Sequence, residues 1–154
     1  MEYVCKEVTM RLQLALNVRD IDEAVDFYGR LFGAKPHKRR AGYANFAIEN
    51  PPLKLVLFEN PGADERLNHL GVEALDQVEL DGAVKRLKTA DILHREQAET
   101  TCCHATQNKA WSNEPQGLSW EWYRITDDDP LDVPATDGGV CCEQDQGAAD
   151  IRCA

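Results

Sequence analysis

The sequence predicts an α+β protein built from two β-α-β-β-β modules. Three observations support this fold class: a strand pattern that leads into a capped helix, three short strand patterns after it, and a second copy of the opening strand and helix in the later half. In that second copy, Asn68-His69-Leu70 corresponds to Leu12-Gln13-Leu14. A chain of 154 residues is long enough for one domain in which two modules share a core.

The first module is expected at about residues 10–60. Arg11–Val18 alternates like a strand and leads into Asp20, which forms a helix start of the capping-box type with Glu23. Apolar residues then recur at helical spacing until Gly33, so a helix is predicted from about Asp20 to Phe32. Turn-forming residues separate three further predicted strands, near Pro36–Arg40, Tyr43–Ile48 and Leu53–Glu59.

The second module is expected at about residues 66–125. It is predicted to contain a strand at Leu67–Glu73, an amphipathic helix at Leu75–Ala90, and strands around Ile92–Gln97 and Leu118–Tyr123. Compared with the first module, it has an insertion around Ala98–Lys109. We expect this insertion to be a polar loop that opens and closes over a metal site.

Charge and hydropathy exclude several classes of function. The formal charge is -10, and residues 126–154 hold eight of the acidic residues against Arg152 alone, which indicates a flexible acidic tail. Binding of nucleic acid through a basic face is therefore disfavoured. No apolar run is long enough to span a membrane, and Met1–Arg11 lacks the apolar stretch of a secretory signal, so a cytoplasmic protein is predicted.

The six cysteines include two adjacent pairs. Cys102 and Cys103 lie in the predicted insertion, and Cys141 and Cys142 lie in the acidic tail. A cytoplasmic protein keeps its thiols reduced, and the α-carbons of neighbouring residues are too close for an unstrained disulfide. Both pairs are therefore interpreted as two thiols side by side. Cys5 is interpreted as incidental.

Three polar residues interrupt strands that are otherwise suited to burial, namely Gln13, His69 and Glu121. One explanation is that strands alternate faces, with Glu121 in solvent and the neighbouring tryptophans inside. The repeat favours a second explanation, because it places Gln13 and His69 at equivalent positions of two modules. One amide, one imidazole and one carboxylate can hold a divalent ion and leave its other side open. Val56, which corresponds to Glu121 in the first module, supplies no fourth ligand.

Six segments resemble the carbon–arsenic lyases and their cadmium-induced relatives, within the vicinal-oxygen-chelate or glyoxalase/dioxygenase superfamily. These segments are Gln13–Val18, Phe27–Phe32, Gly42–Ile48, Pro52–Leu57, Leu67–Glu73 and Thr100–Cys103. The resemblance covers about residues 10–125 and implies the paired-module fold of that superfamily. It also implies non-haem Fe(II) bound by Gln13, His69 and Glu121, which departs from the two-histidine set common in the oxygenases of the superfamily.

The resemblance further implies an activity. Dioxygen would be the co-substrate, and a trivalent organoarsenical with a methyl or aromatic group would lose that group and leave arsenite. Cys102 and Cys103 would hold the arsenic, since soft arsenic prefers thiolates whereas iron(II) prefers nitrogen and oxygen. Accessory roles are considered for His104, directly after the pair, and for Cys141 and Cys142 as a capture arm. His37 and His94 are expected to be exposed and not to bind metal.

Two other classes of function stay open from the sequence. One is another metal-dependent enzyme of the same fold, glyoxalase-like or thiol-transferring, which would not need the cysteine pair. The other is a non-catalytic protein that traps arsenic or cadmium on its thiols. A bleomycin-type binding protein is the least favoured, because it needs no metal triad. The repeat is compatible with a monomer and with a homodimer that swaps modules.

Overall fold

The protein was analysed in a computed structural model that describes residues 7–102 and 104–131. These residues form a single eight-stranded sheet in the order β2-β3-β4-β1-β5-β8-β7-β6. The two modules join where β1 (Met10–Val18) pairs antiparallel with β5 (Leu67–Ala74). Within each module the first strand pairs in parallel with the last, β1 with β4 (Leu53–Glu59) and β5 with β8 (Ser119–Asp127). The α+β class and the two modules are thus confirmed.

The first module follows the prediction closely. Helix α1 (Ile21–Phe32) starts after Asp20, whose side chain accepts a hydrogen bond from the Glu23 amide, and ends at Gly33 with a φ of 60°. The next strands are β2 (Lys38–Arg40), which is shorter than expected, and β3 (Tyr43–Ile48). Helix α1 packs on the outer face of β3 and β4 over an apolar core that includes Ile21, Phe46, Leu55 and Leu57. The opposite face of these strands is left to line the site.

The second module contains a strand that was not predicted. Helix α2 (Gln77–Thr89) lies within its expected range, but β6 (Arg95–Cys102) and β7 (Ala105–Asn113) form an antiparallel hairpin where a polar loop was expected. The loop prediction for Ala98–Lys109 was therefore wrong. Its cause is visible in the burial of β7, where Gln107 and Lys109 face inward beside Ala105. Polar residues on an inward face conceal the alternation by which a strand is usually recognised.

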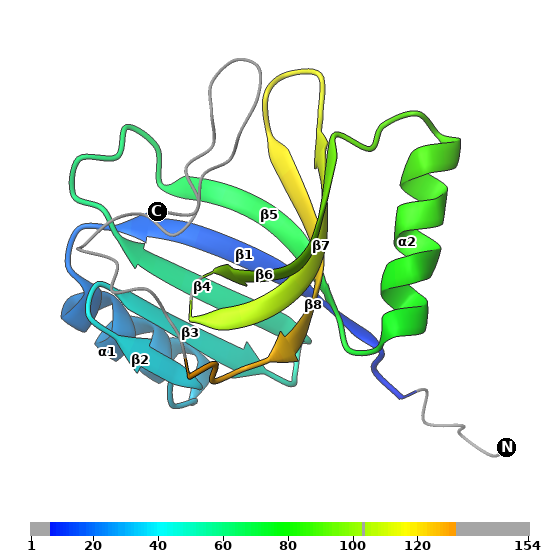
Figure 1. Ribbon diagram of the computed structural model, residues 1–154. Coiled ribbons are helices and arrows are strands. Elements are labelled where there is room, and N and C mark those ends of the chain that lie inside the picture. The colour runs from blue at the N-terminus through cyan, green and yellow to red at the C-terminus, as the bar shows by residue number, and fades with distance from the viewer. Residues whose placement is uncertain (1–6, 103, 132–154) are drawn as a thin grey trace, which may run out of the picture.

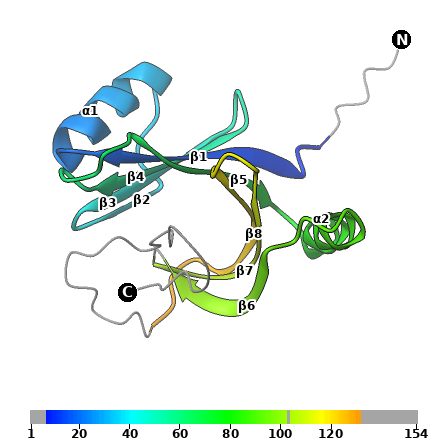
Figure 2. The same cartoon turned by 90° about the horizontal axis from the view of Figure 1, so that it is seen from above.

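The sheet curls into a cup. Figures 1 and 2 show β6, β7 and β8 turning away from the plane of β1 and β5, so that they stand opposite β2, β3 and β4. Helix α1 lies outside the wall formed by β2, β3 and β4. Helix α2 lies outside the wall formed by β6, β7 and β8, against β8, β7 and β5. No helix in the described part of the chain is long and apolar enough to cross a bilayer.

Candidate metal and substrate site

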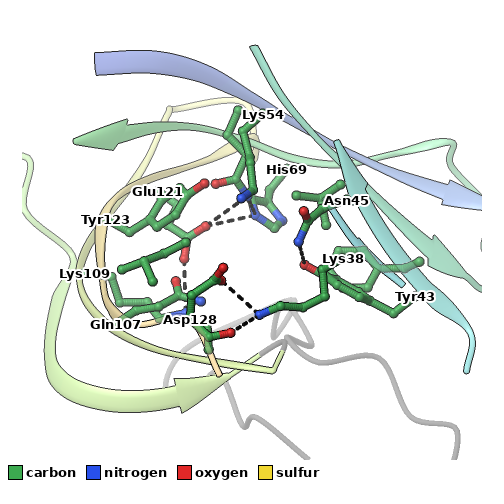
Figure 3. Close-up of a pocket in the computed structure, with 15 residues that line it drawn as sticks. Lys38, Tyr43, Asn45, Lys54, His69, Gln107, Lys109, Glu121, Tyr123 and Asp128 are labelled. Atoms are coloured by element: carbon green, nitrogen blue, oxygen red, sulfur yellow. Dashed lines mark hydrogen bonds and ion pairs between the residues drawn. The ribbon is translucent and has the colours of Figure 1, made fainter. Parts of the chain in front are cut away.

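Gln13, His69 and Glu121 converge inside the cup. The Nε2 atom of His69 lies 3.0 Å from Nε2 of Gln13 and 3.1 Å from Oε2 of Glu121. Nε2 of Gln13 donates to the same Glu121 oxygen at 3.2 Å. All three residues are buried, at 5%, 2% and 4% exposure, and Figure 3 shows His69 and Glu121 pointing toward each other. The alternative in which Glu121 lies in solvent is thus wrong, since Trp120 and Trp122 take the outer face.

Strand register explains how residues so far apart in sequence meet. Gln13 pairs with Gly71 across the β1–β5 junction, and Gly71 in turn pairs with Glu121 on β8. Glycine is needed between them, because a Cβ atom on Gly71 would lie 2.6 Å from the Glu121 carbonyl oxygen and 3.3 Å from Oε1 of Gln13. His69, two residues earlier on β5, points to the same face as Gly71 because side chains alternate along a strand.

Neighbouring side chains orient the imidazole and the carboxylate. Nδ1 of His69 lies 2.7 Å from Oδ1 of Asn68, whose amide donates to Asn17. Oδ1 of Asn68 can only accept, so His69 donates from Nδ1 and turns Nε2 toward Glu121. The other oxygen of Glu121 accepts from the ammonium group of Lys109 at 3.1 Å, and that side chain is only 1% exposed. Lone pairs on Nε2 of His69 and Oε2 of Glu121 would repel each other, so this pair needs a cation between its two atoms, either a proton or a metal ion.

These residues fit a divalent transition-metal ion. Two ligand atoms that bind one ion at right angles, each about 2.1 Å away, lie about 3.0 Å apart. The three edges of the triangle formed by Gln13, His69 and Glu121 are 3.0, 3.1 and 3.2 Å. Oε1 of Gln13 is buried without a hydrogen-bond partner, and turning the amide would bring this oxygen into the triangle. No cluster of three or more His, Cys, Asp and Glu side chains suited to a metal occurs among the described residues. The Gln13 amide is therefore needed as a third ligand beside His69 and Glu121.

The triad borders a narrow cavity of about 30 Å³ that opens to solvent. Apolar and aromatic side chains line it from both sides of the cup, namely Tyr43, Val56 and Phe58 from β3 and β4, and Tyr123 and Ile125 from β8, with polar groups between them. Val56 lines the cavity opposite the carboxylate side and supplies no ligand, as the repeat predicted. An apolar pocket with a few convergent polar groups is typical of a small-molecule site.

Charged groups in and beside the cavity have shifted pKa values. Burial lowers the pKa of Lys54, and the nearby Glu73 carboxylate offsets part of this effect. Burial raises the pKa of Tyr123 well above its usual value of 10.0, with Glu73 and Glu121 adding to the effect, so its phenol stays protonated. At the mouth, burial opposes ionisation of Asp128, but hydrogen bonds from Lys38 and His37 outweigh it and lower the pKa of Asp128.

Of the predicted thiol pair, Cys102 is described and lies at the end of β6. It is 4% exposed and packs in a cluster with Ala15, Tyr43, Val56 and Phe58, three of which line the cavity. Its backbone carbonyl accepts from Nε2 of Gln107, a further cavity residue. Cys103, like Cys5, Cys141, Cys142 and Cys153, lies outside the described residues.

The three other histidines are not part of the triad. His104 lies in the hairpin turn with a φ of 64°, and its ring is 5.5 Å from that of Tyr43. His37 and His94 are exposed, as expected, and His37 pairs with Asp128 at 2.7 Å. β8 continues to Asp127, and Asp128 after it bonds to Lys38, so both acidic residues belong to the folded part.

Sequence reasoning missed Lys54, Lys109 and Asn45 as cavity residues. Lys54 and Asn45 stand in apolar strands at positions that read equally well as facing solvent, and Lys109 lies in the segment that was predicted to be a loop. The signal was available for Lys54, because helix α1 already had an apolar face to cover one side of β4. A buried cup on the other side of the sheet would then make Lys54 a lining residue.

A curled eight-stranded sheet of two β-α-β-β-β modules, with a polar triad in its cup, defines a protein of the vicinal-oxygen-chelate fold. The chain belongs to the glyoxalase/bleomycin resistance protein/dioxygenase superfamily, whose family model matches residues 11–122. The confirmed part of the resemblance thus covers both modules.

Two similar curated proteins match most of the chain. It is 46% identical to the trivalent organoarsenical cleaving enzyme of Thermomonospora curvata, over 90% of this chain and 93% of that protein. It is 47% identical to the cadmium-induced protein CadI of Mycobacterium tuberculosis, over 86% of this chain and 93% of that protein. Among solved structures, the Mn(II)-bound glyoxalase of Novosphingobium aromaticivorans has a TM-score of 0.55 at 18% identity, covering 82% of this chain and 42% of that chain. That structural likeness supports the fold alone.

Proposed function

We propose that this protein uses iron(II) and dioxygen to cleave the C–As bond of trivalent organoarsenicals, both methyl and aromatic, and releases arsenite. The observation that carries the proposal is the convergence of Gln13, His69 and Glu121 in a cavity against whose wall Cys102 packs. Family membership and the 46% identity to an organoarsenical cleaving enzyme support an enzyme of this class. Action in the cytoplasm, as a monomer or homodimer, is part of the same proposal.

Gln13, His69 and Glu121 would hold the iron(II), which supplies activation of dioxygen when bound. His69 presents Nε2 because Asn68 fixes its other nitrogen. Glu121 supplies one carboxylate oxygen to the metal and keeps the other on Lys109. Gln13 supplies a neutral oxygen, so the set balances less of the metal charge than two carboxylates would. These three residues would hold the metal at the border of the cavity, where a substrate could reach it.

Cys102 and Cys103 would hold the arsenic. An organoarsenical with one As–C bond has two exchangeable positions, and two adjacent thiols can occupy both while the carbon stays attached. The position of Cys102 in the wall formed by Tyr43, Val56 and Phe58 would place the organic group in the apolar part of the cavity. His104, directly after the pair, is proposed as an accessory group that favours the thiolate form.

The test is arsenic speciation after air is admitted to anaerobic protein loaded with iron(II) and methyl-As(III). Arsenite should appear only with both iron and air, and Cys102→Ser should reduce its release strongly at low substrate. A matched control is Cys5→Ser, which should release arsenite at the wild-type rate. Tight binding of the arsenical without any arsenite would contradict the proposal.

A second candidate is a thiol trap without catalysis, which the 47% identity to a cadmium-induced protein favours. A trap would bind one equivalent of cadmium or arsenical and leave the C–As bond intact. The same speciation experiment separates the two functions, because only the enzyme exceeds one turnover per chain.

A further inference from the structure

Three buried lysines line the cavity, and two of them are neutralised by carboxylates. Lys109 bonds to Glu121 at 3.1 Å, and Lys38 bonds to Asp128 at 2.9 Å. Lys54 is equally buried, at 3% exposure, yet it forms no hydrogen bond or ion pair with any residue that the structure describes. The cavity thus has one more ammonium group than carboxylates, even before a metal cation is bound.

The position of Lys54 relates this extra charge to the triad. On β4 it pairs in register with Gln13 of β1, so both side chains stand on the same face of the sheet. Figure 3 shows Lys54 beside His69 and Glu121, at the same cavity. The carboxylate of Glu73, which acts on Lys54 through space, is itself held by Arg11 at 2.5 Å. The Lys54 ammonium group faces the cavity without a bonded partner among the described residues, so a bound anion there would offset part of the cost of burying its charge.

Two further features indicate an organic anion rather than an inorganic one. Asn45, on the adjacent strand β3, has a buried amide oxygen without a hydrogen-bond partner and lines the same cavity. Its amide therefore has a polar atom available to a ligand, whichever way the group is turned. Tyr43, Val56 and Phe58 form the wall nearby, which suits an aromatic ring.

We infer that Lys54 anchors an acidic substituent on the organic part of the substrate. The substrate class would be aromatic trivalent arsenicals that have a carboxylate or an ionised phenol on the ring. Their arsenic lies at the thiols, and their acidic group lies at Lys54. The inference rests on the proposed function for the identity of the reactive group, but the anion subsite itself does not require C–As cleavage.

The test compares two ligands of nearly equal shape, 4-carboxyphenyl-As(III) and 4-carbamoylphenyl-As(III). Their dissociation constants are measured anaerobically by calorimetry on the metal-free full-length protein, so that turnover plays no part. Any binding of arsenic to other thiols contributes equally for both ligands. The wild type should bind the carboxylate about tenfold more tightly or better, as a charged hydrogen bond would provide.

Three variants make the ratio of the two constants decisive. In Lys54→Met the ratio should fall to near one, whereas Lys54→Arg should retain a preference for the carboxylate. Lys35→Met, which removes an exposed lysine, should keep the wild-type ratio. A wild type that does not discriminate, or a Lys54→Met variant that still does, would overturn the inference. Arsenite release measured in parallel tests the proposed function separately, because either result can hold without the other.

Discussion

At the scale of single residues, the triad depends on the absence of a side chain at Gly71. This residue lies between Gln13 and Glu121 in the register of three neighbouring strands. The side chains of Gln13 and Glu121 can approach His69 only because nothing projects from β5 at that point. The triad was predictable from the sequence because polar side chains interrupted apolar strands at repeat-related positions. The need for Gly71 was not, because it arises from pairing between strands.

The substitution Gly71→Ala should therefore weaken iron(II) binding by about tenfold or more, as loss of ligand orientation does. The added methyl group would lie 2.6 Å from the Glu121 backbone oxygen and would push β8 away from β5. Calorimetric titration of iron(II) measures the effect. Gly82→Ala in α2 is the control, since nothing lies within 4 Å of its added Cβ. That variant should bind iron normally and gain roughly 0.5–1 kcal/mol of stability. Normal iron affinity in Gly71→Ala would contradict the argument.

Lys109 should stabilise the metal-free protein more than the metal-bound one. Its ammonium group pairs with Glu121 where both side chains are almost fully buried. Lys109→Met should cost about 3–5 kcal/mol in the metal-free protein, because a buried carboxylate loses its partner. Iron(II) should recover part of this loss, since its charge also compensates Glu121. Anaerobic urea unfolding with and without iron(II) measures both values. An equal loss under both conditions would show that iron does not contact Glu121.

At the scale of elements, strand β7 (Ala105–Asn113) shows where sequence reasoning stops. Helix α1 was predicted almost to the residue, because its cap, its apolar spacing and Gly33 all agree. β7 was missed because its inward side chains include Gln107 and Lys109, which serve a polar cavity and not an apolar core. Strands that line a polar cavity depart from the hydrophobic pattern, because the inward residues that give the cavity its function are polar.

The mouth of the cup is held by contacts between β2 and the end of β8. Lys38 donates to the side chain and backbone of Asp128 and to the carbonyl of His104, and His37 pairs with the same carboxylate. These contacts join the two modules at the edge opposite the β1–β5 junction. The ionised form of Asp128 is favoured in the folded protein, since its pKa lies below the usual 3.8.

Asp128→Asn should therefore lower the free energy of unfolding near neutral pH by roughly 1 kcal/mol, a modest value because the carboxylate is partly exposed and screened. The contribution is present above the usual pKa of 3.8 and is lost as the pH falls through the lower folded value. Urea unfolding across this acid range measures it. Asp129→Asn is the matched control, because the Asp129 side chain is 89% exposed and its ion pair with Arg40 is long, at 3.4 Å. A difference between wild type and Asp128→Asn that persists in strong acid would contradict this account.

At the scale of the whole molecule, the two modules complete one site within a single chain. The first supplies Gln13, and the second supplies His69 and Glu121. The asymmetry between modules puts Val56 in place of a second carboxylate, so the side of the cavity formed by β3 and β4 has no carboxylate opposite Glu121.

The acidic tail adds a prediction at this scale. Removing residues 132–154 takes away Cys141, Cys142 and Cys153 but keeps Asp127 and Asp128, which belong to the folded part. If these thiols capture arsenicals for the site, the apparent KM should rise while kcat stays unchanged. Steady-state release of arsenite at low substrate measures this. A full-length variant with these three cysteines changed to serine should behave in the same way, and unchanged kinetics in both proteins would exclude a capture role.

The central claim is that Gln13, His69 and Glu121 together hold the metal, and anaerobic calorimetric titration of iron(II) into the metal-free protein tests it most directly. We predict one iron per chain for the wild type. His69→Ala and Glu121→Ala should each weaken binding by more than about 100-fold, and Gln13→Ala should weaken it less, because an amide is the weakest of the three ligands. Iron binding of wild-type stoichiometry and affinity in both His69→Ala and Glu121→Ala would contradict the account.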